Sequence, residues 1–152
     1  MSEQKYFLPF LKPVYNFFSP LAFALLRITT GLFLMPHGAQ KLFGALGGKG
    51  LAAEATAFAH LGIPMPHLVA AATGSVEFFG GLLIALGLFT RPAAFAATIV
   101  LFNAMAIVHL QHGFFAQKGG FEYAALWMIA TLFFSVRGGG CLSVDRLIGR
   151  EF

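Results

Sequence analysis

Ionisable side chains occur inside and at the ends of the long apolar stretches of this sequence. Six of them are candidate site residues, namely Arg27, His37, Lys41, Glu77, His109 and Glu122. Within an apolar segment, a charge costs at least about 2.5–3.5 kcal/mol when it is placed at mid-membrane depth. Histidine exchanges protons near neutral pH, and a carboxylate can relay them. This set therefore favours proton-coupled chemistry, or binding of a lipid-soluble molecule with a polar head.

Two of these charges are predicted to meet. At about 1.5 Å per residue, Arg27 lies about 10 Å from the expected cytoplasmic end of the first helix, and Glu77 lies about 13 Å from the expected outer end of the second. An arginine side chain can bridge the remaining difference in depth within a core about 30 Å thick. We therefore predict an ion pair between Arg27 and Glu77, which either belongs to the site or only fastens two helices together.

The other ionisable groups gather near the ends of three helices. His37 and Lys41 are one turn apart, His109 and His112 have i, i+3 spacing, and Glu122 precedes the last apolar segment. We expect them to surround a pocket that opens to the outer side. Alternatively, Lys41, His112 and Glu122 only extend to the lipid headgroups. The histidines and Glu122 could also be metal ligands, but i, i+3 histidines alone are weak evidence, so no metal site is predicted.

The elements that must position these groups are apolar helices. A spanning helix needs about 20 mostly apolar residues. Four segments have about this length or approach it, with the turn Thr90–Arg91–Pro92 between the second and the third; they cover residues 21–43, 68–89, 93–115 and 123–136. The fold class expected is all-α, an integral membrane four-helix bundle. Residues 1–20 are predicted to form an interfacial arm, 21–147 the transmembrane domain and 148–152 a C-terminal tail.

Composition excludes a soluble enzyme and a disordered chain. Only 11% of the 152 residues are charged and 58% are hydrophobic, whereas soluble domains average roughly 25% charged residues. The basic residues form no run, so nucleic acid is not an expected partner. Six Lys or Arg would lie on the side of the termini and three on the other side, which predicts that both termini are cytoplasmic. The single cysteine, Cys141, excludes an intrachain disulfide.

Several short motifs, in this order and spacing, resemble the DoxX family of small membrane proteins. They follow Arg27 and are HGAQKLFG at 37–44, LGIPMP at 61–66, GSVEFFGGLLIALGLFTRPAA at 74–94, His109, GGFEYA at 119–124 and GGGCLSVDRL at 138–147. The resemblance covers about residues 21–147 and leaves out the N-terminal arm.

The resemblance implies a four-helix bundle in the bacterial inner membrane. Related subunits of thiosulfate:quinone oxidoreductase pass electrons to membrane quinone, so the family suggests quinone as the cofactor. His37, His109 and Glu122 are then expected to be catalytic, and Arg27, Lys41 and Glu77 to bind the cofactor.

The expected function is that of a membrane redox protein or quinone-interacting subunit of an oxidoreductase. The alternative is a non-enzymatic transporter of a small solute or lipid, or a scaffold for a soluble partner. Expected partners are the lipid bilayer and quinone or another lipid-soluble molecule. A soluble redox partner and a homo-oligomer stay open.

Overall fold

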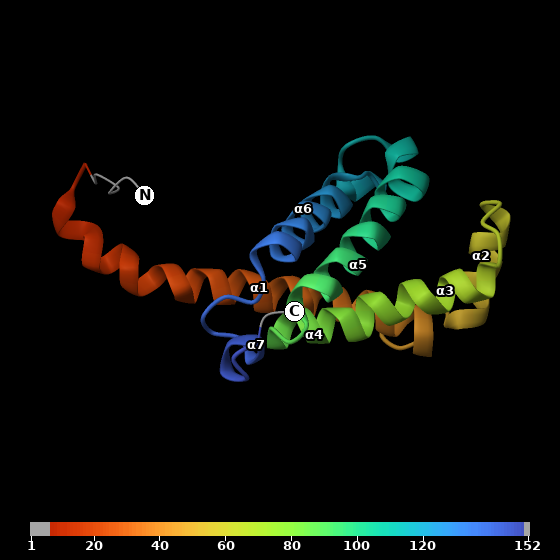
Figure 1. Ribbon diagram of the computed structural model, residues 1–152. Coiled ribbons are helices and arrows are strands. Elements are labelled where there is room, and N and C mark those ends of the chain that lie inside the picture. The colour runs from red at the N-terminus through yellow and green to blue at the C-terminus, as the bar shows by residue number, and fades with distance from the viewer. Residues whose placement is uncertain (1–6, 151–152) are drawn as a thin grey trace.

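The computed structural model describes residues 7–150, and every regular element in this range is a helix (Figure 1). Four long helical stretches form the body of the molecule. They are α1 (Lys12–Phe43), then α3 (Pro66–Ser75) continued by η2 (Val76–Gly80) and α4 (Gly81–Leu86), then α5 (Thr90–Asn103) continued by η3 (Ala104–His109) and η4 (Leu110–His112), and finally α6 (Glu122–Arg137). The shorter elements are η1 (Pro9–Leu11), α2 (Leu51–His60), η5 (Ala116–Lys118) and α7 (Val144–Leu147).

The helices confirm the predicted all-α membrane fold. Within the described residues, the stretches 9–43, 66–86 and 90–112 are long and apolar enough to cross a membrane. The fourth, α6, has 16 residues, fewer than the roughly 20 that a full crossing needs. Between the first two spans, residues 51–60 form the short helix α2.

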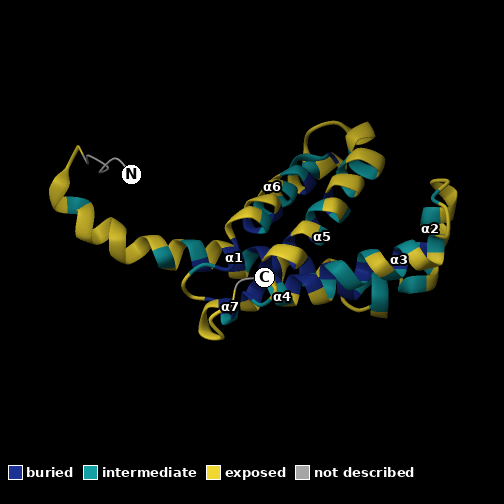
Figure 2. Ribbon diagram, viewed as in Figure 1, coloured by how far each residue is buried: buried dark blue, intermediate teal, exposed yellow. Residues whose placement is uncertain are grey.

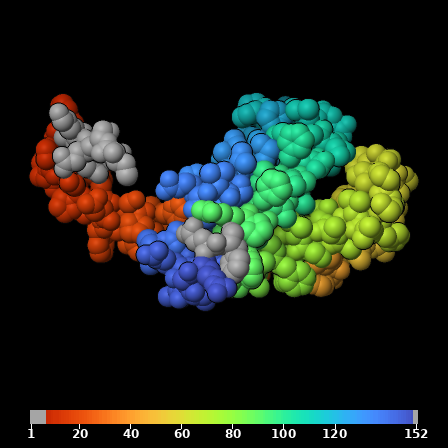
Figure 3. Space-filling view, viewed as in Figure 1, coloured from red at the N-terminus to blue at the C-terminus, as the bar shows by residue number. Residues whose placement is uncertain are grey.

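The first helix begins earlier than the sequence predicted. It starts at Lys12 and continues through Pro20, so the expected start at residue 21 is wrong. A proline inside a helix removes one intrahelical hydrogen bond and crowds the preceding turn, but membrane helices tolerate it because the freed backbone carbonyl finds other partners. The N-terminal part of α1 extends alone beyond the bundle, and its apolar side chains are exposed (Figures 2 and 3). Residues 1–6 lie outside the described range, and the position of the arm at the membrane surface stays a prediction.

The turn between the second and third stretches was also misplaced. Helix α4 ends at Leu86, where Gly87 adopts the left-handed conformation, and α5 already begins at Thr90. The turn is therefore 87–89, and the Thr90–Arg91–Pro92 sequence forms the first turn of α5. Glycine at this position ends the helix without the steric cost that a side chain would bring.

Helix α1 packs antiparallel against α3, η2 and α4 through glycines. A Cβ atom added at Gly31 would lie 2.5 Å from the backbone nitrogen of Ala85, and one added at Gly38 would lie 2.6 Å from the carbonyl oxygen of Gly74. Small residues allow such close backbone approach in membrane helices. These contacts fix the register of the two stretches, with Gly31 opposite α4 and Gly38 opposite the end of α3.

Helices α5 and α6 form a hairpin that leans away from α1 and α3 (Figure 1). The buried core lies where the hairpin joins the other helices, and it consists of Leu34, Ile84, Ala93, Ala94, Ala97, Leu101 and Phe134. In the space-filling view, the tip of the hairpin and the α2 end of the molecule stand as two lobes (Figure 3). The space between α3 and α5 therefore widens toward the α2 end.

Candidate functional site

An ion pair links α1 to the second helical stretch. Lys41 Nζ donates hydrogen bonds to both carboxylate oxygens of Glu77, at 3.0 and 2.7 Å. The Glu77 side chain is only 7% exposed and that of Lys41 is 20% exposed. Both groups belong to the predicted site, and the charge of each is compensated by the other.

The predicted pairing of Arg27 with Glu77 is wrong. The glycine contacts place Arg27 opposite Ala85 and Gly87, whereas Glu77 lies two turns away toward Lys41. The depth estimate failed because it measured each residue from an assumed helix end, and α1 begins nine residues earlier than expected.

Arg27 instead binds the C-terminal segment. Its guanidinium group donates to the carbonyl oxygens of Gly139 and Leu142 and, at 3.3 Å, to that of Ala85. Asp145 anchors the same segment, since its carboxylate accepts hydrogen bonds from the backbone N–H groups of Phe89 and Thr90 and from the Thr90 hydroxyl. We call Arg27, Thr90 and Asp145 the C-terminal clasp, and its role is structural.

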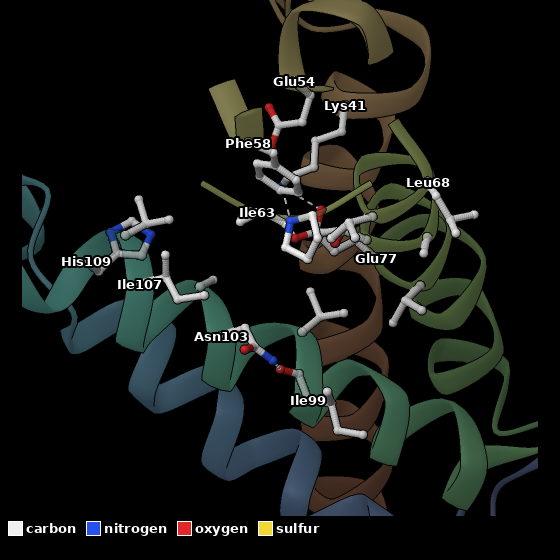
Figure 4. Close-up of a pocket in the computed structure, with 18 residues that line it drawn as sticks. Lys41, Glu54, Phe58, Ile63, Leu68, Glu77, Ile99, Asn103, Ile107 and His109 are labelled. Atoms are coloured by element: carbon white, nitrogen blue, oxygen red, sulfur yellow. Dashed lines mark hydrogen bonds and ion pairs between the residues drawn. The ribbon is translucent and has the colours of Figure 1, made fainter. Parts of the chain in front are cut away.

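Beside the ion pair lies a cavity of about 710 Å³, between α1, α2, the α3–η2 stretch and the α5–η3 stretch (Figure 4). Its walls are largely apolar, with side chains such as Phe58, Leu68 and Ile107. Lys41, Glu54, Glu77, Asn103 and His109 supply its charged and amide groups. Pockets of about 300–1,000 Å³ with apolar walls and a few polar groups are typical of small-molecule sites.

Two of the polar groups lie on π-helical turns. Glu77 is in η2 and His109 is in η3, and both elements have π-helical hydrogen bonding. Such turns are rare within α-helices and are frequent at functional sites. The two π-helical turns thus lie on opposite walls of the cavity, each with an ionisable side chain.

His109 is held by a hydrogen bond to the hairpin tip. Its Nδ1 lies 2.7 Å from the carbonyl oxygen of Gly119. Since a carbonyl oxygen only accepts, Nδ1 is the donor, and the neutral ring then has its Nε2 lone pair available. His109 can therefore take up a proton at Nε2.

The remaining predicted residues do not line this cavity. Glu122 accepts a hydrogen bond from the backbone N–H of Ala116, and His112 Nδ1 donates to the carbonyl oxygen of Val108, both within the hairpin tip. His37 is exposed and does not belong to the cavity lining. In the described part of the chain, no three His, Cys, Asp or Glu side chains gather in a metal-binding group.

Sequence reasoning missed the contribution of α2. Glu54 and Phe58 of this helix line the cavity, although neither was among the predicted site residues. Its i, i+4 spacing of Glu54 and Phe58 places them on one face, which was the signal available in the sequence.

Comparison with known proteins agrees with this architecture. The DoxX family profile matches residues 22–110. The chain is 30% identical to an uncharacterized protein of Haemophilus influenzae over 84% of this chain and 91% of the relative. It is 27% identical to a Bacillus subtilis protein named "Putative oxidoreductase CatD", over 82% of this chain and 84% of that one.

A further relative is the inner membrane protein YphA of Escherichia coli, which is 28% identical over 84% of this chain and 90% of its own length. No solved structure gave a significant match. The family match covers more than half of the sequence, and within the described residues three helical stretches have the length and hydropathy of membrane spans. The chain therefore belongs to the DoxX family and is a membrane protein.

Proposed function

We propose that this protein is a membrane redox protein, or the membrane subunit of an oxidoreductase, and that it binds a quinone in the cavity beside Glu77. The observation that carries the proposal is the combination of an apolar cavity with one charged end, formed by Lys41, Glu54 and Glu77. The name of CatD, a relative over most of its length, supports the redox class. The likeness to YphA supports an inner-membrane location.

The residues of the cavity fit such a molecule. A quinone has an apolar tail and a ring with two carbonyl oxygens, and it takes up electrons and protons when it is reduced. The apolar walls would accommodate the ring and the start of the tail. The Lys41 ammonium group has three N–H donors, and two of them donate to the carboxylate oxygens of Glu77. The remaining N–H of Lys41 can donate to a carbonyl oxygen in the cavity.

Lys41 and His109 have separate tasks in this proposal. Lys41 provides positive charge where negative charge develops, and such fixed charge is worth most in a site that excludes water. His109 takes up and releases a proton at Nε2, while its bond to Gly119 keeps the ring in place. Glu77 balances the charge of Lys41 and exchanges protons. His37, Glu122 and Arg27, which do not line the cavity, have no direct contact with the quinone in this proposal.

The test is quinone binding by the full chain in lipid nanodiscs. Decylubiquinone, a short-tailed quinone, is titrated while thermal unfolding is followed by circular dichroism. A ligand at about 100 times its Kd stabilises the folded state by about 2.7 kcal/mol. We expect protection of the wild type, and loss of it in Ala104→Phe, because Ala104 lines the cavity.

The matched control is Ala106→Phe, on the same π-helical turn but exposed and outside the cavity lining. This variant should retain the protection. Equal protection of all three proteins would mean that the quinone acts by dissolving in the lipid, and would contradict the proposal. Flux of a small solute through the protein without any redox change would support the transporter alternative instead.

A further inference from the structure

A second cavity, of about 410 Å³, lies behind the charged end of the first one. It lies between the last turns of α1, the glycine-rich loop at 44–50 and α2, and it is partly open to the outside. Its lining is predominantly polar, unlike that of the first cavity, and it includes Lys49 of the loop. A polar cavity next to a loop is suited to hold water.

Lys41 and Glu54 line both cavities. Glu77, by contrast, lines only the larger one, and its side chain is 7% exposed. The two shared side chains therefore separate a polar cavity from an apolar one. In the close-up, Glu54 and Lys41 lie together at the α2 end of the larger cavity, and Glu77 lies deeper (Figure 4).

Glu54 is available for proton exchange. Within residues 7–150, its carboxylate has no hydrogen bond or ion pair, and it is half-buried. The charged and titratable groups around Glu77 in the larger cavity are Lys41 from α1, Glu54 from α2 and His109 from η3. Of these, Lys41 and Glu54 also face the polar cavity.

We propose that Glu54 is the proton-exchange residue of this site, and that it connects the buried Glu77 to water in the second cavity through Lys41. This inference rests on the proposed function only for the reason why protons are needed, since a quinone takes up protons when it is reduced. The proton route itself does not require a bound quinone. The geometric basis is that Glu54 and Lys41 are shared by the two cavities.

The transfer is balanced in protons and involves no electrons. Lys41 passes a proton from its ammonium group to Glu77 along the 2.7 Å hydrogen bond. Glu54 makes no direct hydrogen bond to Lys41, so the protonated Glu54 then returns a proton to Lys41 through a water molecule of the second cavity, which both side chains line, and becomes a carboxylate. A hydronium ion in the second cavity protonates Glu54 again and becomes water. The net change is one proton moved from a hydronium ion to Glu77, with Lys41 still charged at the end.

The experiment measures proton arrival at Glu77 in the quinone-free full chain. A pH jump is produced by photolysis of a caged proton, and the C=O stretch of the protonated carboxyl is followed by time-resolved infrared spectroscopy. Glu77→Asp, which keeps the carboxylate, assigns the band by shifting it. A positioned proton-transfer group contributes about 10²–10⁴-fold to a rate, so Glu54→Gln should slow the appearance of the band by at least tenfold.

Two further variants make the result specific. Glu54→Asp keeps an acid and should restore the rate to within about threefold of the wild type, since proton transfer needs the acid rather than its full length. Glu122→Gln removes a carboxylate that lines neither cavity and should leave the rate unchanged. An unchanged rate in Glu54→Gln, or an equal slowing in Glu122→Gln, would overturn the inference. Decylubiquinone binding is measured separately on the same proteins, so failure of the quinone proposal is distinguished from failure of the proton route.

Discussion

Removal of the Lys41–Glu77 ion pair provides the sharpest test of the site geometry. The pair is held by two charge-assisted contacts, at 3.0 and 2.7 Å. Hydrogen bonds to charged groups contribute about 1.5–3 kcal/mol each. Breaking a fully buried pair by removing one partner costs about 3–5 kcal/mol. Since the Lys41 side chain is 20% exposed, we expect Glu77→Gln to cost about 3 kcal/mol, at the lower end of that range.

The assay is a double-mutant cycle measured by reversible unfolding in mixed micelles with increasing sodium dodecyl sulfate. The losses of unfolding free energy in Lys41→Gln and Glu77→Gln should be non-additive by about 2–3 kcal/mol. Each single variant leaves one charge unpaired, whereas the double variant leaves none. Arg27→Gln and Glu77→Gln should be additive within about 0.5 kcal/mol, because residues without shared partners act independently. Coupling of Glu77 to Arg27 instead of Lys41 would refute the helix register described above.

Two other parts of the fold make predictions that the same unfolding assay checks. Asp145→Ala should cost about 2–4 kcal/mol, because it removes the carboxylate that accepts from the N–H groups of Phe89 and Thr90. The control is Arg146→Ala at the adjacent exposed residue, which should change stability by less than about 0.5 kcal/mol. Similar losses in both variants would argue against the clasp. Gly31→Ala should cost about 1–3 kcal/mol through overpacking against α4. Gly80→Ala is its control, because an added Cβ there has ordinary contacts at 3.7 Å, and equal losses at both glycines would contradict the close approach of the helices.

The helices were predictable from the sequence because the bilayer imposes a simple condition. A backbone in hydrocarbon must satisfy its own hydrogen bonds, so long apolar segments become helices. The segments ending at Phe43 and beginning near Leu68 were located to within two residues. The start of α1 was wrong because hydropathy reports where the apolar stretch begins, and a helix can continue past it through proline.

The partners of the charges were less predictable, because they depend on register. Lys41 and Glu77 were both recognised as site residues, but their direct contact requires the glycine packing of α1 against η2. The π-helical turns have no signature in the composition or spacing of their residues. Asp145 was overlooked because its partners, Phe89 and Thr90, are 56 and 55 residues away along the chain.

The clasp also has a consequence for biosynthesis. Arg27 leaves the ribosome long before its acceptor at Gly139, which is 112 residues further along the chain. At about 5–20 residues per second, this interval is roughly 6–22 s. During that time the arginine lies in the first apolar segment without its final carbonyl partners. Assembly of the bundle should therefore be completed only when residues 139–145 arrive. A chain that stops before residue 139 should be recognised by the membrane proteases as unfinished, even though all its apolar segments have been inserted.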